Sequence, residues 1–223
     1  MLVIFDFDGT LADSWSVAAE ELVAAAPMFG YRPLTRSQVE SLRGLPTREV
    51  FREFGVSRWR IPKIAAHLRD RFERSAAQIK LFDGIPEMLA ALTEAQILTG
   101  IVSSNSKGTI ATVLGPANMR HVAQMECGAS LFGKSRLFKR MMRKLGAASS
   151  VTIAVGDETR DLDAAAKAGI VGLGVEWGYA RPELLRSMAQ GRTFRTVTEL
   201  TADLVGRAIA MRNDARDLFD SRR

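Results

Sequence analysis

The chain has 223 residues, of which 47% are apolar and 25% are charged, and this composition excludes an intrinsically disordered chain. Its apolar runs are shorter than the roughly 20 residues that a membrane-spanning helix needs, so no membrane association is expected. The single cysteine, Cys127, excludes an intrachain disulfide and predicts a cytoplasmic protein. The formal net charge of +6 is interpreted as a solvated, arginine-rich surface, with attraction of anionic substrates or nucleic acid as the alternative.

Short apolar runs alternate with helical patterns along most of the chain. Residues 2–7 predict a buried strand that ends in carboxylates. Further runs predict strands at 97–102, 151–155 and 170–175, and a less regular run predicts one at 121–127. Helices are expected between these strands, including 86–95 and 161–168. This alternation is typical of an α/β protein with a Rossmann-like parallel sheet covered by helices on both faces.

Polar side chains follow three of the predicted strands. Asp6, Ser103 and Asp157 each stand at the point where an apolar run stops. In parallel sheets the carboxyl ends of the strands share one edge, and ligands bind there. The sequence therefore predicts that these three residues meet at a binding site.

The segment from residue 14 to about residue 80 differs from the rest, because its patterns predict only helices. Helices are expected at 15–29, 35–42, 47–54 and 61–78. Such a segment is too long for an ordinary loop. We therefore expect an α/β core domain formed by residues 1–13 and 81–223, and an inserted all-helical cap domain, residues 14–80. An apolar stripe that includes Trp59 and Ile64 is expected to form the core of this cap.

The segment Asp6-Phe7-Asp8-Gly9-Thr10 carries the clearest chemical signal in the chain. Alternation along an extended backbone places Asp6 and Asp8 on the same side. Two neighbouring carboxylates repel each other unless a cation or a proton relieves them, and a divalent metal with oxygen ligands does so. One carboxylate can then attack phosphorus while the other transfers a proton. Gly9 is expected to let the backbone turn closely around a phosphate.

This segment, extended to Asp13, resembles the first motif of the haloacid dehalogenase-like hydrolases. Ser103 is similar to the second motif, a serine or threonine at the end of the second strand. The run from Gly156 through Asp157 to Asp161 is similar to the fourth motif. Residues 81–92 resemble the segment with which family members return from the cap to the core. The order and separation of these motifs cover nearly the whole chain.

The resemblance implies a role for each acidic residue. Asp6 would be the nucleophile that forms an aspartyl-phosphate, and Asp8 would protonate the leaving alcohol and then activate water. Mg²⁺ would be held by the Asp6 carboxylate, the Asp8 backbone carbonyl and Asp157, with Asp161 supporting these ligands. A cation is physically required, because a dianionic phosphate does not otherwise approach a carboxylate.

The resemblance also indicates which residues bind the phosphate and balance its charge. Ser103 and nearby groups would bind phosphate oxygens, although Ser103, Ser104 and Asn105 also suit a turn or a helix cap. Lys134 is the best match to the lysine of the third motif, but the family's commoner Lys-Pro-x-Pro context is absent, and a surface lysine at a helix start is the alternative. The substrate-binding residues expected from the sequence are Gly9, Thr10, Ser104, Asn105, Arg43 and Arg48.

Two further segments have alternative interpretations. Arg43 and Arg48 lie in residues 42–49, which resemble the cap segment that reaches the active site in related enzymes. Either arginine would there bind a carboxylate or a second anionic group of the substrate; exposed arginines at a helix start are the alternative. Trp177-Gly178-Tyr179 follows the last predicted strand and lines either the rim of the site or the core.

Residues 134–145 predict an amphipathic helix with a basic outer face, without the interleaved aromatic residues of an RNA-binding surface.

The leading functional hypothesis is a magnesium-dependent phosphomonoesterase that acts on a small phosphate ester, most like a phosphoglycolate phosphatase. Two alternatives remain: a sugar-phosphate mutase of the β-phosphoglucomutase type, and a catalytically idle binding protein with the same fold. Haloacid dehalogenation is disfavoured because that activity uses neither a second aspartate such as Asp8 nor magnesium. Nucleic acid is an improbable partner, and the sequence does not indicate the oligomeric state.

Overall fold

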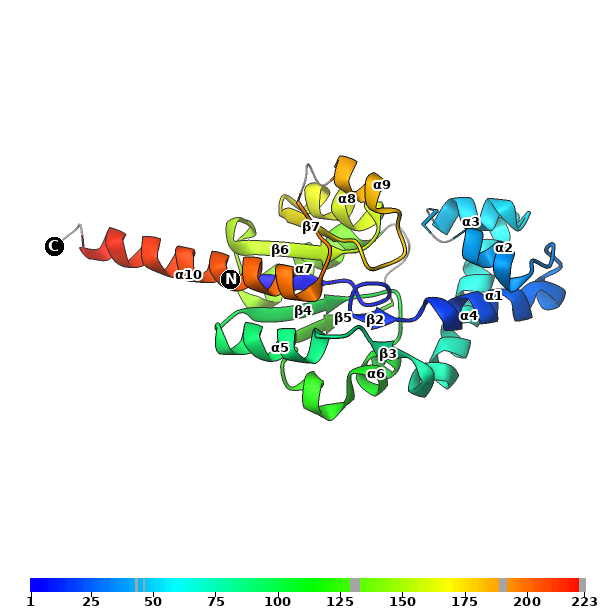
Figure 1. Cartoon of the computed structure of the whole chain (residues 1–223), viewed down its shortest axis with the longest axis horizontal. Coiled ribbons are helices and arrows are strands. Elements are labelled where there is room, and N and C mark those ends of the chain that lie inside the picture. The colour runs from blue at the N-terminus through cyan, green and yellow to red at the C-terminus, as the bar shows by residue number, and fades with distance from the viewer. Residues whose placement is uncertain (43, 46, 129–132, 189–191, 221–223) are drawn as a thin grey trace.

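The computed structural model describes residues 1–42, 44–45, 47–128, 133–188 and 192–220. A six-stranded sheet with the order β5-β4-β1-β6-β7-β8 forms the centre of this part of the chain, and its neighbouring strands are parallel (Figure 1). The strands are β1 (Leu2–Phe5), β4 (Leu98–Val102), β5 (Gln124–Glu126), β6 (Thr152–Gly156), β7 (Val171–Val175) and β8 (Thr193–Phe194). The predicted α/β fold is confirmed; the sequence had not indicated β8.

Strand β1 shows how the sequence builds both faces of the sheet. All four of its residues are buried, so the strand reads as a continuous apolar run. Val3 and Phe5 belong to the apolar cluster on one face, and Leu2 and Ile4 belong to the cluster on the other. This follows from the period of two in a strand, which directs successive side chains to opposite faces.

Helices cover both faces of the sheet (Figure 1). The first face packs against α5 (Ile85–Glu94), α6 (Lys107–Met119) and α10 (Val197–Asp220). The second face packs against α7 (Lys134–Leu145) and α8 (Thr159–Ala168). Helix α9 (Pro182–Met188) lies beside α8, where Leu185 packs on Leu162. Helix α10 extends well past the sheet, which the sequence pattern did not predict.

The insertion after β1 is helical, as expected. It contains α1 (Trp15–Phe29), α2 (Arg36–Ser41), α3 (Thr47–Glu53) and α4 (Ile61–Ser75), together with two 3₁₀ turns, Arg58–Arg60 and Ala76–Gln78. These helices gather around their own apolar cluster, which includes Val39, Phe54 and Ile64. The expectation for Trp59 was wrong: its side chain is 74% exposed and lies under the Arg60 guanidinium.

Two short antiparallel strands connect the insertion to the rest of the chain. β2 (Ala12–Asp13) pairs with β3 (Lys80–Leu81), so the segments that enter and leave the insertion lie side by side. Figure 1 shows the helical insertion at one end of the molecule and the far end of α10 at the other. Among the described residues, none of the helices is both long enough and apolar enough to cross a bilayer.

Candidate active site

Three buried carboxylates meet at the carboxyl edge of the sheet. Asp6 follows β1, Asp157 follows β6, and Asp161 lies in the first turn of α8. One carboxylate oxygen from each lies within 4.8 Å of the others. All three side chains are almost fully buried. The sheet topology thus brings together acidic residues from two separate parts of the sequence.

Lys134 lies against two of these carboxylates. Its Nζ is 2.6 Å from an Asp6 oxygen and 2.5 Å from an Asp161 oxygen. The side chain is buried although it opens the strongly basic helix α7. Burial lowers the pKa of Lys134, but Asp161 and Asp6 outweigh burial and raise it overall, so the ammonium stays charged. Because it is buried, Lys134 is not a surface lysine.

Negative charge exceeds positive charge around this lysine. Burial raises the pKa of Asp6, and it raises that of Asp157 well above its usual value, with further contributions from neighbouring carboxylates. Glu158 and Arg160 adjoin the cluster and form an ion pair at 2.7 Å, so they do not change the net charge. Buried like charges are stable only with a proton or a cation between them. The all-oxygen donor set and the excess negative charge therefore fit a divalent cation such as Mg²⁺.

Asp8 has a different set of partners. Its carboxylate accepts a hydrogen bond of 2.7 Å from the Ser14 hydroxyl and bonds of 3.0 and 2.8 Å from the Asn105 amide nitrogen. Burial raises the pKa of Asp8 to about 6, although the Ser14 hydrogen bond acts in the opposite direction. A carboxyl with this pKa is able to give and take a proton near neutral pH. Its side chain is not one of the three carboxylates that meet, but the nearby Asp6 charge also raises its pKa.

Asp157 is fixed by the loops around it. The Thr10 hydroxyl donates to one of its oxygens at 2.9 Å, and the Tyr179 backbone N–H donates to the other at 2.8 Å. Gly9 has a φ of +74°, and a Cβ there would lie 2.2 Å from an Asp157 oxygen. The structure therefore gives Gly9 a role that the sequence had not indicated: it admits the Asp157 carboxylate.

The residues after β4 form a turn at the same edge. Ser103 is fully buried, and its hydroxyl accepts a hydrogen bond of 3.0 Å from the Asn105 backbone N–H. Ser104 is half-buried between them. Ser106, rather than Ser103, caps the following helix α6 by accepting from the Thr109 backbone N–H. Ser103 is therefore not the N-cap, although it does take part in the turn.

The predicted cap segment reaches the edge of the site. Gly44 and Leu45 line a small hollow together with Glu158, Thr159 and Ala180. Arg43 lies outside the described residues, as does the side chain of Arg48 on α3. The predicted roles of these two arginines therefore stay predictions.

Glu158, Arg160 and Ser14 lie around the site but were not assigned to it from the sequence, whereas Trp177 and Tyr179 were predicted to line either its rim or the core. Glu158 and Arg160 lie within the fourth motif, where only Asp157 and Asp161 were given a role. Ser14 and Tyr179 contact each other through their hydroxyl groups at 2.5 Å, across 165 residues of sequence. A contact between residues so far apart leaves no local pattern in the sequence. The sequence therefore allowed Tyr179 either at the rim of the site or in the core. Trp177 also borders the site region, where its indole N–H donates to the Thr10 carbonyl.

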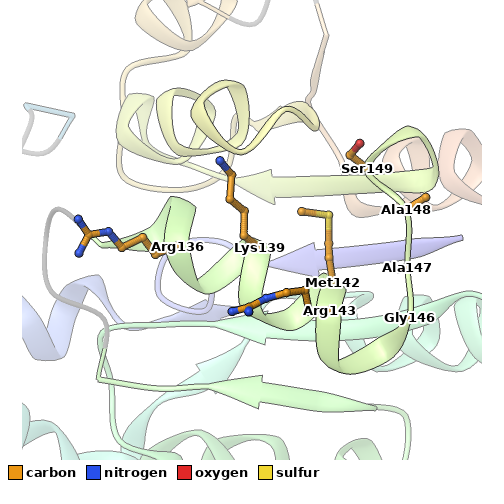
Figure 2. Close-up of a pocket in the computed structure, with 8 residues that line it drawn as sticks. All are labelled: Arg136, Lys139, Met142, Arg143, Gly146, Ala147, Ala148 and Ser149. Atoms are coloured by element: carbon orange, nitrogen blue, oxygen red, sulfur yellow. The ribbon is translucent and has the colours of Figure 1, made fainter.

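A second hollow lies away from the carboxylates. It has a volume of about 830 Å³ and is lined by α7 and the segment that leads into β6 (Figure 2). Figure 2 shows the side chains of Arg136, Lys139 and Arg143 projecting from α7. These residues are exposed, which confirms the basic outer face expected for this helix.

Comparison with known proteins agrees with this geometry. Residues 3–175 match the haloacid dehalogenase-like hydrolase family. The chain is 32% identical over 178 residues to a phosphoglycolate phosphatase of Synechococcus elongatus, covering 79% of this chain and 84% of that protein. It is also 29% identical over 188 residues to the tyrosine-protein kinase PtkA of Mycobacterium tuberculosis, covering 82% of this chain and 65% of that protein.

Solved structures show the same fold. The crystal structure of a predicted phosphatase from Clostridium acetobutylicum superposes with a TM-score of 0.78 at 22% identity. The match covers 92% of this chain and 98% of that one.

A parallel sheet with a helical insertion and a buried acidic cluster at its carboxyl edge is typical of hydrolases with a Rossmann-like core. The chain belongs to the haloacid dehalogenase-like hydrolases, and within that family it is a phosphatase.

Proposed function

We propose that this phosphatase is a magnesium-dependent phosphomonoesterase acting on a small phosphorylated metabolite of the phosphoglycolate kind. The observation that carries the proposal is the buried group of Asp6, Asp157 and Asp161 with Lys134 in contact. The Synechococcus elongatus relative, named a phosphoglycolate phosphatase, supports the substrate class.

Mg²⁺ would be held by the Asp6 and Asp157 carboxylates and by the Asp8 backbone carbonyl, with Asp161 orienting these ligands. When bound, the ion would offset the repulsion between a phosphate dianion and the carboxylates and would polarise the phosphoryl group. Asp157 suits this role because Thr10 and Tyr179 fix both of its oxygens. Lys134 adds a fixed positive charge on the Asp6 side of the cluster.

In the proposed reaction, an Asp6 carboxylate oxygen bonds to phosphorus as the ester P–O bond breaks. Asp8 gives its proton to the departing oxygen, so an alcohol leaves and an aspartyl-phosphate remains. Asp8, now ionised, takes a proton from water, which attacks the same phosphorus. Inorganic phosphate leaves and the Asp6 carboxylate is restored. The pKa of Asp8, about 6, is suited to both proton transfers.

Phosphate binding would fall to the loops at the same edge. The proposed contacts are Ser103, the backbone N–H of Ser104 and the turn at Gly9, whose own N–H donates to the Ala12 carbonyl. Thr10 and Asn105 were expected to bind phosphate as well. Their side chains donate to Asp157 and Asp8, so we propose that they act mainly by holding those carboxylates.

The insertion is proposed to be a cap domain, residues 14–80, on a core formed by residues 1–13 and 81–223. The pairing of β2 with β3 at its base and its separate apolar cluster support this division. A cap that closes over the site would exclude water and select small substrates. Arg43 and Arg48 are proposed to bind a second anionic group, such as the carboxylate of phosphoglycolate.

The experiment is a measurement of phosphate release from p-nitrophenyl phosphate and from phosphoglycolate, with and without Mg²⁺. Asp6→Asn should abolish turnover, whereas Asp163→Asn, an exposed aspartate on α8, should leave it unchanged. Release that needs no divalent cation, or that survives Asp6→Asn, would contradict the proposal. Isomerisation of a hexose phosphate in place of hydrolysis would identify the mutase alternative, and no turnover at all would favour the binding protein.

A further inference from the structure

The Tyr179 hydroxyl is linked to Asp8 through Ser14. Ser14 donates to an Asp8 carboxylate oxygen at 2.7 Å, and the Tyr179 hydroxyl lies 2.5 Å from the same serine oxygen. A serine hydroxyl has one proton, so when Ser14 donates to Asp8 the phenol must be the donor to Ser14. The bonds therefore run in one direction, from Tyr179 through Ser14 to Asp8.

Ser14 does not make the hydrogen bond that its place in the chain favours. It is the N-cap residue of α1, where a serine side chain usually accepts from the backbone N–H of the first turn. Here no such bond forms, and the fully buried hydroxyl turns toward Asp8 instead. Loss of a cap destabilises a helix. The orientation of Ser14 is thus better explained by Asp8 and Tyr179 than by the stability of α1.

Tyr179 contacts both parts of the molecule. Its backbone N–H donates to Asp157 in the core, and its ring packs on Trp15, the first residue of α1, with ring centroids 5.3 Å apart. Tyr179 also borders the apolar cluster of the insertion. The position of α1 therefore governs whether the Tyr179 hydroxyl reaches Ser14.

We propose that Tyr179 is a positioning residue: through Ser14 it orients the Asp8 carboxyl for proton transfer, and it does so only when the helical insertion is seated against the core. This inference rests on the proposed function, in which Asp8 is the acid and the base. Asn105 holds Asp8 from the other side, so loss of the phenol hydroxyl should misplace Asp8 without removing it.

The test compares substrates that differ in their need for an acid. p-Nitrophenolate is a good leaving group and departs from phosphorus without a proton, whereas the alkoxide of glycolate, released from phosphoglycolate, needs one. In kcat/KM, which reports formation of the aspartyl-phosphate, Tyr179→Phe should lower the phosphoglycolate value at least tenfold more than the p-nitrophenyl phosphate value. Ser14→Ala should give the same selective loss. A merely structural role for Tyr179 would lower both values equally.

Tyr31→Phe is the matched control. Tyr31 is buried, and its hydroxyl donates to the Leu22 carbonyl inside the insertion. This variant should lose thermal stability but keep the ratio of the two kcat/KM values. Asp8→Asn separates the two proposals. If Asp8→Asn lowers kcat/KM for phosphoglycolate more than for p-nitrophenyl phosphate and Tyr179→Phe does not, the positioning role is refuted and the proposed function stands. If Asp8→Asn lowers both values equally, Asp8 is not the acid and the proposed function is wrong on that point.

Discussion

The carboxyl edge of the sheet and the helical insertion are stabilised in opposite ways. At the edge, Asp6 and Asp157 are buried and Asp8 is half-buried, all three with raised pKa values, and negative charge is in excess. In the insertion, side chains such as Phe54 and Ile64 are buried in apolar contact. The edge gathers like charges, whereas the insertion resembles an ordinary apolar core.

This difference separates stability from chemistry. Burying like charges destabilises the folded protein, and such clusters with shifted pKa values are typical of catalytic and binding sites. Burying apolar side chains provides most of the free energy of folding. Substitutions at the edge should therefore change metal binding and turnover, while substitutions in the insertion should change the free energy of unfolding.

The largest expected effect on stability is in the insertion. Phe54→Ala removes a ring that is 1% exposed and lies edge-on to Tyr31. The loss should be about 3–5 kcal/mol in the free energy of unfolding, measured by urea denaturation. Trp59→Ala, at an exposed ring of the same insertion, should cost less than about 1 kcal/mol. A Phe54→Ala variant with unchanged stability but no turnover, measured at a temperature where it is folded, would contradict this division between stability and chemistry.

A smaller effect is expected when the edge loses a ligand. Asp157→Asn should weaken Mg²⁺ binding by about 100-fold, equivalent to about 2.7 kcal/mol, because a charged ligand oxygen is lost. The readout is the rise in melting temperature that Mg²⁺ produces, which does not depend on turnover. Asp203→Asn, which removes an ion pair with Arg207 on α10, should leave that rise unchanged. An equal rise in both variants would place the metal elsewhere.

The smallest effect concerns a carboxylate away from the cluster. A bidentate hydrogen bond from Arg186 and a hydroxyl from Thr193 lower the pKa of Glu176 to about 2. Its contribution is present above pH 4.5, the ordinary pKa, and is lost as the pH falls toward 2. This is opposite in sign to the effect of the raised pKa values at the active-site edge.

Glu176→Gln should therefore cost about 1 kcal/mol at neutral pH, since the Arg186 partner is exposed and screened. The difference from the unsubstituted protein should shrink as the pH falls toward 2 and vanish only below it, where Glu176 is protonated as well. Urea denaturation at several pH values measures it. A difference that persists undiminished at low pH would assign the loss to packing instead of charge.

Much of the sheet could be predicted because its signal is local. The runs that begin at residues 2, 97, 151 and 170 became strands β1, β4, β6 and β7, and Asp6, Ser103 and Asp157 follow three of them. Parallel topology then brings their ends to one edge without further information. Lys134 was predicted as the best match to the lysine of the third motif, and its ammonium lies against Asp6 and Asp161.

What the sequence did not show depends on contacts between distant segments. Gly9 was expected to approach a phosphate, which stays a prediction; that it also admits Asp157, from another loop, was not foreseen. The link from Ser14 to Tyr179 needs the loop after β7 to fold back beside the start of α1. Trp59 was placed in the insertion core by its helical spacing, yet it lies in a 3₁₀ turn whose spacing differs.

The central claim is that Asp6 bonds covalently to phosphorus. The most direct measurement is an acid quench of the enzyme during turnover of phosphoglycolate with Mg²⁺, followed by mass spectrometry of its peptides. We expect one added phosphoryl group on the peptide that contains Asp6, and none on that peptide in Asp6→Asn. Steady turnover with no phosphoryl group on that peptide, or with the group on another residue, would contradict it.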